Sequence, residues 1–249
     1  MPLRRIVTIE LRKMFDTRAG FWMMASIVMA ALLATCGVVL FASNSQLTYA
    51  NFTKAIGFPM AAILPVIAIL SVTSEWSQRI GLTTFTLVPQ RHLVIVAKAI
   101  ASIAVAVISM LIAFGIGALG NITGAAIADR SLVWDVGIVE ALLFVAGNIL
   151  GVLTGFMLGV LIRNSAGAVA GYAVYTFLVP AVFSVWASSQ SAFEQLRGWI
   201  DVGYAQFPLL KLNGAPTTHQ WAQIGVTGTV WLLVPLLIGL AMFMKSEVK

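Results

Sequence analysis

Charged residues are scarce in this sequence, because Asp, Glu, Lys and Arg make up only 10% of its 249 residues. An ordinary soluble domain carries about 25% charged residues. Hydrophobic residues make up 60% of the chain, and the mean hydropathy is +0.97. These values exclude an ordinary soluble domain and indicate an integral membrane protein. The net charge is +6, but the basic residues are dispersed and not interleaved with aromatic residues, so nucleic acid is excluded as a partner.

The sequence also lacks the motifs of several enzyme classes. It contains no Gly-x-x-x-x-Gly-Lys-Ser/Thr loop for nucleotide phosphates, no His-Glu-x-x-His and no Gly-x-Ser-x-Gly. His92 and His219, the two histidines, fall in loops that we expect on opposite sides of the membrane, and the single cysteine, Cys36, excludes an internal disulfide. We therefore predict no catalytic, cofactor or metal site on this chain, which is not expected to be an enzyme.

Long apolar runs are what the sequence has instead. Backbone groups without partners cost several kcal/mol each in hydrocarbon, so spanning segments are helices or closed barrels, and these runs lack the alternation of barrel strands. The sequence therefore predicts an all-α, polytopic integral membrane protein with a single transmembrane domain over residues 1–249. The six expected transmembrane helices cover residues of about 21–41, 56–73, 93–119, 136–162, 166–187 and 223–244.

The distribution of Lys and Arg predicts the orientation in the membrane. With a cytoplasmic N-terminus, eleven of these residues fall on the cytoplasmic side and four on the other. Cytoplasmic loops carry an excess of Lys and Arg. We therefore expect a multi-pass protein of the cell membrane, with both termini and the polar segment 74–98 in the cytoplasm.

The stretch "LRRIVTIELRKMFDTR", residues 3–18, has the pattern of an amphipathic helix that precedes the first span. Leu3, Ile6 and Leu11 share one side, and basic residues fill the other, although Glu10 interrupts the apolar side. This pattern favours an interfacial helix on the inner membrane surface. The alternative is a frayed terminus whose charges only set the topology.

The polar segment between the second and third spans reads "SEWSQRIGLTTFTLVPQRHLVIVAK". Glu75 stands four residues before Arg79, the favourable order for an ion pair on a helix, and Pro89 ends the pattern. One stripe of this short helix, over about residues 75–87, carries Trp76, Ile80, Thr83 and Leu87. We interpret it as a docking or coupling element. A loop that merely joins two spans is the open alternative.

Small residues recur along the fourth and fifth spans. A helix face that carries only small residues allows a neighbouring helix to pack closely. Packing inside the bundle is the favoured interpretation, and a sliding surface or a dimer seam is the alternative. We also expect Asn148, which is polar at membrane depth, to hydrogen-bond between helices. The glycines at four-residue spacing are Gly147, Gly151, Gly155 and Gly159, followed by Gly167 and Gly171.

The loop 188–222, before the last span, has a helix signal of its own. Ser191 and Glu194 fit a capping box, and apolar residues follow at helical spacing. We predict a short extracytoplasmic helix over about residues 191–204 that dips toward the bilayer. It would line an exit or form a lid over helix ends.

Several stretches together resemble one family of membrane proteins. They are "ELRKMFDTRAGFW", the polar segment quoted above, "GNILGVLTGFMLGVLIRNSAGAVAGY" and "WLLVPLLIGLAMFMKSEVK". The chain is similar along its whole length to the permease subunits of ATP-binding-cassette (ABC) transporters of the type-two, exporter-like class found in bacteria. The resemblance implies an N-terminal elbow helix at 3–18 and a coupling helix at about 75–87. The residues that it implies for contact with the ATPase are Glu75, Trp76, Arg79, Ile80 and Thr83.

The resemblance also implies a function and partners. The chain would be a permease in the bacterial cell membrane that exports a hydrophobic or amphipathic substrate, such as a lipid, peptide, glycoconjugate or drug, by alternating access. Two copies of a separate ABC ATPase subunit would bind ATP and Mg, and a second permease, identical or a paralogue, would complete a dimer among membrane lipids. The alternatives are a non-transporting assembly or regulatory protein and an ATP-independent secondary carrier.

Overall fold

The computed structural model describes residues 2–16, 18–77 and 91–245. Within these ranges every regular element is a helix, so the all-α prediction is confirmed. Six of the helical segments are long and apolar enough to cross a membrane, as the sequence predicted. These segments are Gly20–Phe41, Tyr49–Ser74, Leu93–Ile127, Ile138–Ile162, Ser165–Ser189 and Thr218–Lys245.

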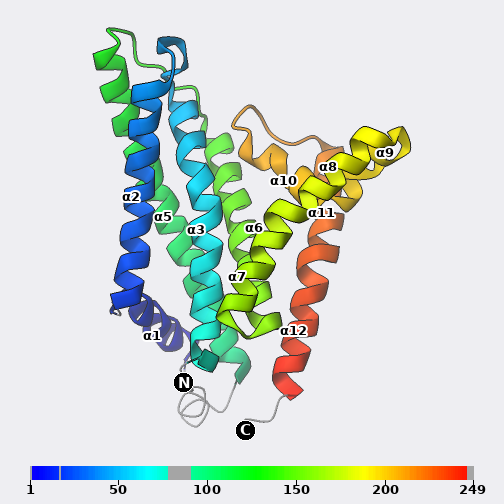
Figure 1. Ribbon diagram of the computed structural model, residues 1–249. Coiled ribbons are helices and arrows are strands. Elements are labelled where there is room, and N and C mark those ends of the chain that lie inside the picture. Colours follow the sequence, from blue (N-terminus) through cyan, green and yellow to red (C-terminus); the bar gives the residue numbers. More distant parts are fainter. Residues whose placement is uncertain (1, 17, 78–90, 246–249) are drawn as a thin grey trace.

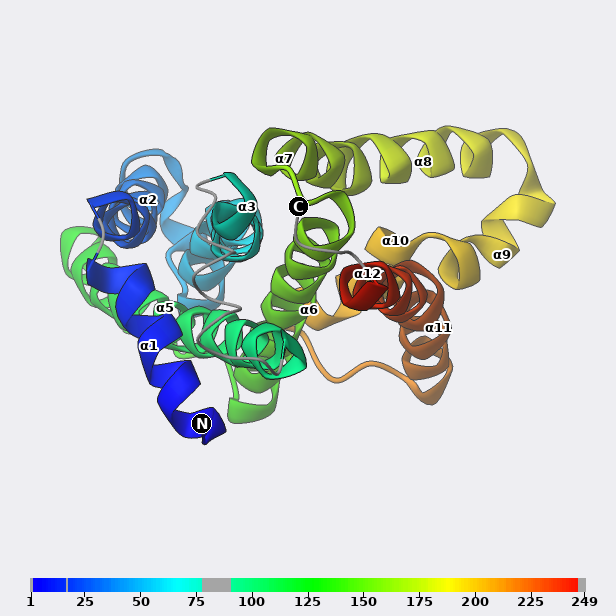
Figure 2. The ribbon, with the colours of Figure 1, turned by 90° about the horizontal axis from the view of Figure 1, so that it is seen from below.

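Four of these segments are single helices that stand side by side (Figure 1). A shorter helix, α1 (Leu3–Asp16), lies across one end of them, the end at which α12 also finishes (Figures 1 and 2). Side chains from these five helices form most of a continuous apolar core that includes Ile27, Met60 and Met110, and Phe243 near the end of the chain joins it. We call this group the packed region. Its spanning helices are α2 (Arg18–Phe41), α3 (Tyr49–Ser77), α5 (Arg91–Ile127) and α6 (Ile138–Ile162).

The remaining helices form what we call the open region, because its fifth spanning segment extends away from the packed region (Figures 1 and 2), while its last helix, α12 (Val234–Lys245), packs against α6. In the most apolar stretches of α3 and α6, 50% of the residues are buried, with 39% in α5 and 17% in α2, against 11% in the fifth spanning segment and 22% in the sixth. The fifth segment consists of α7 (Ser165–Ala173), η2 (Val174–Leu178) and α8 (Val179–Ser189), and the sixth of α11 (Thr218–Gly228), η3 (Thr229–Leu233) and α12 (Val234–Lys245).

Both spanning segments of the open region contain a π-helical turn, η2 and η3, directly before a proline. The same three residues, Leu-Val-Pro, occur at both places and end at Pro180 and Pro235. Proline has no N–H to donate, and its ring collides with the carbonyl four residues earlier. A wider π turn relieves that collision without ending the helix. The two segments therefore remain long enough to span.

The loop before the last span contains two helices where the sequence predicted one over about residues 191–204. They are α9 (Ser191–Ile200) and α10 (Val202–Leu210). The chain breaks at the fully buried Asp201, whose carboxylate accepts a hydrogen bond from the Tyr204 backbone N–H at 3.1 Å and pairs with Arg197 Nε at 3.2 Å. The predicted capping box at Ser191 is wrong, because Gln190 is the N-cap of α9 and makes no side-chain cap.

Candidate functional site

A buried ion pair fastens α1 to the packed region. Lys98 Nζ in α5 lies 2.7 Å from Glu10 Oε2 in α1, and the two side chains are only 3% and 6% exposed. Lys98 Nζ also donates a hydrogen bond to the Ser71 carbonyl of α3 at 2.9 Å. Lys13 Nζ lies 2.7 Å from the other carboxylate oxygen of Glu10. One ammonium group therefore connects α1, α3 and α5.

This network explains why Glu10 interrupts the apolar side of α1. The helix buries Ile6, Glu10 and Met14 on one face, and the carboxylate is tolerated there because Lys98 neutralises it. Burial alone would raise the pKa of Glu10, but attraction to Lys98 and hydrogen bonds from Lys13 and Lys98 outweigh it, so this pKa is lowered from its ordinary value of 4.5. Lys98 was not predicted as a site residue, because it is one of the eleven basic residues assigned to the cytoplasmic side.

The predicted coupling helix, over about residues 75–87, falls largely outside the described residues. Glu75 and Trp76 belong to the last turn of α3, which ends at Ser77. Arg79, Ile80 and Thr83 are among the residues 78–90, which the structure does not describe. Ser71 lies about two turns before the end of α3, and Lys98 lies about two turns after α5 begins at Arg91. The Lys98 network thus stands close to both ends of this segment.

The glycine face of α6 faces two different neighbours. A Cβ on Gly155 would collide with the carbonyl group of Pro65 in α3, and one on Gly159 would lie 3.3 Å from the Ile69 carbonyl oxygen. Backbone meets backbone here, which is the close approach that small residues permit. Gly147, nearer the start of α6, instead faces Leu209 and Leu210 of α10.

The other two predicted glycines lie at the turn between α6 and α7. A Cβ on Gly167 would be 3.1 Å from Ile162 Cγ2, and one on Gly171 would be 3.0 Å from Ile162 Cδ1. Both glycines therefore give room to the last residue of α6. They face neither α3 nor α10 within 4 Å.

Between Gly147 and Gly155 the helices separate and leave a cavity of about 150 Å³. Gly151 borders it, and the nearest atom to a Cβ there would be Pro65 Cγ at 3.6 Å. Side chains and backbone from α3, α6, α7, η2, α8 and α10 line the cavity, so it lies where the packed region meets the open region. Its polar side chains are Asn148, Thr154, Tyr172, Tyr175, Thr176 and Gln206.

Several polar groups of the cavity are satisfied by backbone carbonyls. The Tyr172 hydroxyl donates to the Ala61 carbonyl at 2.7 Å, and Thr154 Oγ1 donates to the Leu150 carbonyl at 2.9 Å. Two groups are not satisfied. The Tyr175 hydroxyl lies near Thr154 but forms no hydrogen bond with any described residue. The Asn148 Oδ1 oxygen likewise has no hydrogen-bond partner among the described residues.

Asn148 does not make the interhelical hydrogen bond that the sequence predicted. Its Nδ2 donates to the carbonyl of Phe144, one turn earlier in the same helix, at 2.9 Å. Asn148 borders the cavity, and its Oδ1 oxygen has no partner among the described residues. The cavity is therefore the second candidate site, after the Lys98 network.

Comparison with known proteins adds no identification. No family model matches the chain, and no curated protein is significantly similar to it.

Proposed function

We propose that this chain is the membrane-spanning permease subunit of an ATP-driven transporter of the ABC type, and that it exports a hydrophobic or amphipathic substrate. The proposal is supported by six helices that can span a membrane and by an amphipathic helix, α1, that crosses one end of them. It is also supported by the sequence stretches that resemble such permeases.

The observation that carries the proposal is the Lys98 network. The polar segment joins the end of α3 to the start of α5, so a force applied to it acts on both helices. Lys98 connects these two helices to Glu10 of α1. Removing one partner of a buried ion pair costs about 3–5 kcal/mol. The three helices are therefore expected to move together, as a coupling element requires.

In the proposed assembly, two ATPase subunits lie beneath two permeases, which are identical or paralogous. The ATPases bind ATP and Mg, and residues 75–87 receive their movement at the cytoplasmic face of a bacterial cell membrane. Only 11% of the residues in the most apolar stretch of the fifth spanning segment are buried, and sparsely packed elements are the ones that rearrange most readily. The substrate path is therefore expected to open where the open region moves against the packed region.

Purification of the tagged protein in mild detergent, with mass spectrometry of what accompanies it, tests the partner. A stoichiometric ATPase subunit is expected. Recovery of the chain alone, folded and dimeric in several detergents, would instead favour a secondary carrier or an assembly protein.

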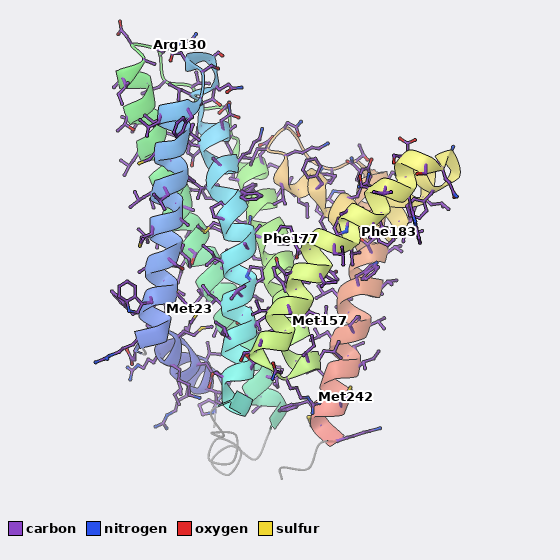
Figure 3. The ribbon with its side chains drawn as sticks, viewed as in Figure 1. Met23, Arg130, Met157, Phe177, Phe183 and Met242 are labelled. Atoms are coloured by element: carbon purple, nitrogen blue, oxygen red, sulfur yellow. The ribbon has the colours of Figure 1, made fainter. Side chains whose placement is uncertain are left out.

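A charge reversal tests the coupling segment. In a complex with the ATPase, Arg79→Glu is expected to abolish the stimulation of ATP hydrolysis by the permease, because it reverses a charge at the proposed contact. Arg130→Glu is the matched control, because Arg130 is exposed at the opposite end of the molecule (Figure 3). If Arg79→Glu stimulates the ATPase as the wild type does, the coupling assignment is wrong.

A further inference from the structure

The cavity bordered by Asn148 has a position suited to a molecule from the bilayer. Asn148 lies about 15 Å along α6 from its start at Ile138, and Tyr175 lies near the middle of the fifth spanning segment. On one side the cavity adjoins η2 and α8, whose outer faces carry exposed apolar residues such as Phe177 (Figure 3). On the other side it adjoins α10, which follows the polar helix α9.

The unpaired oxygen of Asn148 points to a missing hydrogen-bond donor. The side chain is only 4% exposed, its Nδ2 is occupied by Phe144, and its Oδ1 has no partner in the described part of the chain. Buried polar atoms in native proteins are almost always paired. An amide oxygen accepts and cannot donate, so the group that satisfies it must carry an O–H or N–H.

The remaining lining sets the charge and size of the occupant. No ionisable Asp, Glu, His, Lys or Arg side chain of the described residues lines the cavity. A charged group would lose its hydration there without gaining a counter-ion, which is strongly unfavourable. A volume of about 150 Å³ is similar to that of a cavity that accommodates benzene. The occupant is therefore uncharged and has about the size of a glycerol group.

We propose that this cavity binds the uncharged, hydroxyl-bearing headgroup of a lipid, with Asn148 Oδ1 accepting a hydrogen bond from the hydroxyl. Tyr175 also lines the cavity, and its hydroxyl, which has no hydrogen-bond partner among the described residues, offers a second polar contact. The acyl chain lies against the exposed apolar face of the fifth spanning segment. This site is contained in a single chain, and binding requires neither ATP nor a partner subunit.

A competition experiment on the wild-type protein tests the headgroup chemistry. The protein is placed in phosphatidylcholine nanodiscs and labelled with a 1-monoacylglycerol that carries a diazirine in its acyl chain. Unlabelled monoolein is expected to compete at concentrations at least about tenfold lower than two lipids with the same chain, because one net hydrogen bond corresponds to a difference of roughly that size. The two lipids are methyl oleate, which has no hydroxyl donor, and oleoyl lysophosphatidate, which is charged.

Four results of this experiment would overturn the proposal. Equal competition by methyl oleate would mean simple partitioning into the bilayer. Equal competition by lysophosphatidate would contradict the uncharged site. Competition by free glycerol as strong as that by monoolein would assign the cavity to a soluble polyol instead of a lipid. Labelling that cannot be saturated would mean that the cavity holds only water.

Two variants and a matched control test the location. Asn148→Leu removes the acceptor and is expected to weaken monoolein binding about tenfold, while Gly151→Leu fills the cavity and should abolish saturable labelling. Gly225→Leu is the control, because a Cβ at Gly225 would have nothing within 4 Å and this residue does not border the cavity. Unchanged binding in both cavity variants would overturn the location. If either variant does not fold, the competition on the wild type still decides.

The binding proposal and the transport proposal fail separately. Saturable, headgroup-selective binding without any ATPase partner would leave a lipid-binding membrane protein that is not a transporter. An ATPase partner without selective binding would leave a transporter whose substrate lies elsewhere.

Discussion

Glycine has opposite consequences in two helices of this molecule, α6 and α11. In the packed region, Gly155 and Gly159 of α6 let the backbone of α3 approach so closely that a Cβ would contact its carbonyl oxygens. In the open region, a Cβ at Gly225 or Gly228 of α11 would meet nothing within 4 Å. The same residue type creates tight packing in one place and none in the other. Small residues permit close approach, but a neighbouring helix must be there to use it.

Proline shows the same contrast. Pro59 and Pro65 lie inside α3, which stays α-helical through both, and the Pro65 backbone is the surface that Gly155 contacts. Pro180 and Pro235, in the open region, each follow a π turn. Tyr175 and Trp231, one from each π turn, then pack edge to face with ring centroids 5.7 Å apart. The fifth and sixth spanning segments thus contact each other through aromatic rings, whereas α12 packs closely against α6, because a Cβ on Gly239 would lie 3.3 Å from the Leu161 backbone.

The largest effect should come from breaking the ion pair of the packed region. Lys98→Met leaves the Glu10 carboxylate buried without its main counter-charge, and we expect it to lower the free energy of unfolding by about 3 kcal/mol. Unfolding in detergent micelles measures this loss. The double variant Glu10→Gln with Lys98→Met should recover most of it, because no buried charge remains. Wild-type stability in Lys98→Met alone would show that the pair does not fasten α1.

A smaller loss should follow from separating α6 and α3. Gly155→Ala places a methyl group against the Pro65 carbonyl, so we expect a destabilisation of about 1–3 kcal/mol in the same unfolding assay. Gly151→Ala is the matched control on the same helix face, because its Cβ would find Pro65 Cγ at an ordinary 3.6 Å. Equal losses in the two variants would contradict the close packing assigned to Gly155.

The same substitution should have the opposite sign in the open region. Gly228→Ala adds a methyl group with nothing within 4 Å and restricts the unfolded chain, so we expect a gain of about 0.4–1 kcal/mol. A loss comparable to that of Gly155→Ala would mean that another surface covers α11, and the contrast between the two regions would disappear.

The pH dependence sharpens the assignment of Glu10. Because its pKa is lowered in the folded protein, its contribution to stability is present above the ordinary value of 4.5 and is lost as the pH falls through the lowered pKa. Unfolding of the wild type should therefore become easier below this value. The double variant of Glu10 and Lys98 should lose less stability over the same range. Parallel pH profiles would assign the acid sensitivity to other carboxylates.

The sequence predicted the six spans because apolar runs of this length have one stable solution in a bilayer. It did not predict the Lys98 network, because a lysine near the end of an apolar run is ordinarily a loop charge and its partner Glu10 lies 88 residues away. One signal was present, since Glu10 stood on the apolar side of an amphipathic pattern. A carboxylate at such a position indicates a buried cation elsewhere in the chain.

The cavity depended on tertiary structure in the same way. Asn148 stands between Gly147 and Gly151 in the sequence, but which helix faces these glycines decides whether its amide finds a partner. The break between α9 and α10 had a local signal that was overlooked. Asp201 stands three residues before Tyr204, the spacing of a helix N-cap.

We expect the packed region to act as one body and the open region to move against it when ATP is used. Distances between pairs of spin labels test this claim in a Cys36→Ser background, with the ATPase present and ATP added or omitted. Labels at Leu33 of α2 and Leu111 of α5, both exposed, measure a distance within the packed region. Labels at Leu33 and at the exposed Leu237 of α12 measure a distance between the two regions. We predict one narrow, ATP-independent distance for the first pair and an ATP-dependent change for the second. The prediction would be contradicted if ATP changed the Leu33–Leu111 distance as much as the Leu33–Leu237 distance, or if it changed neither distance.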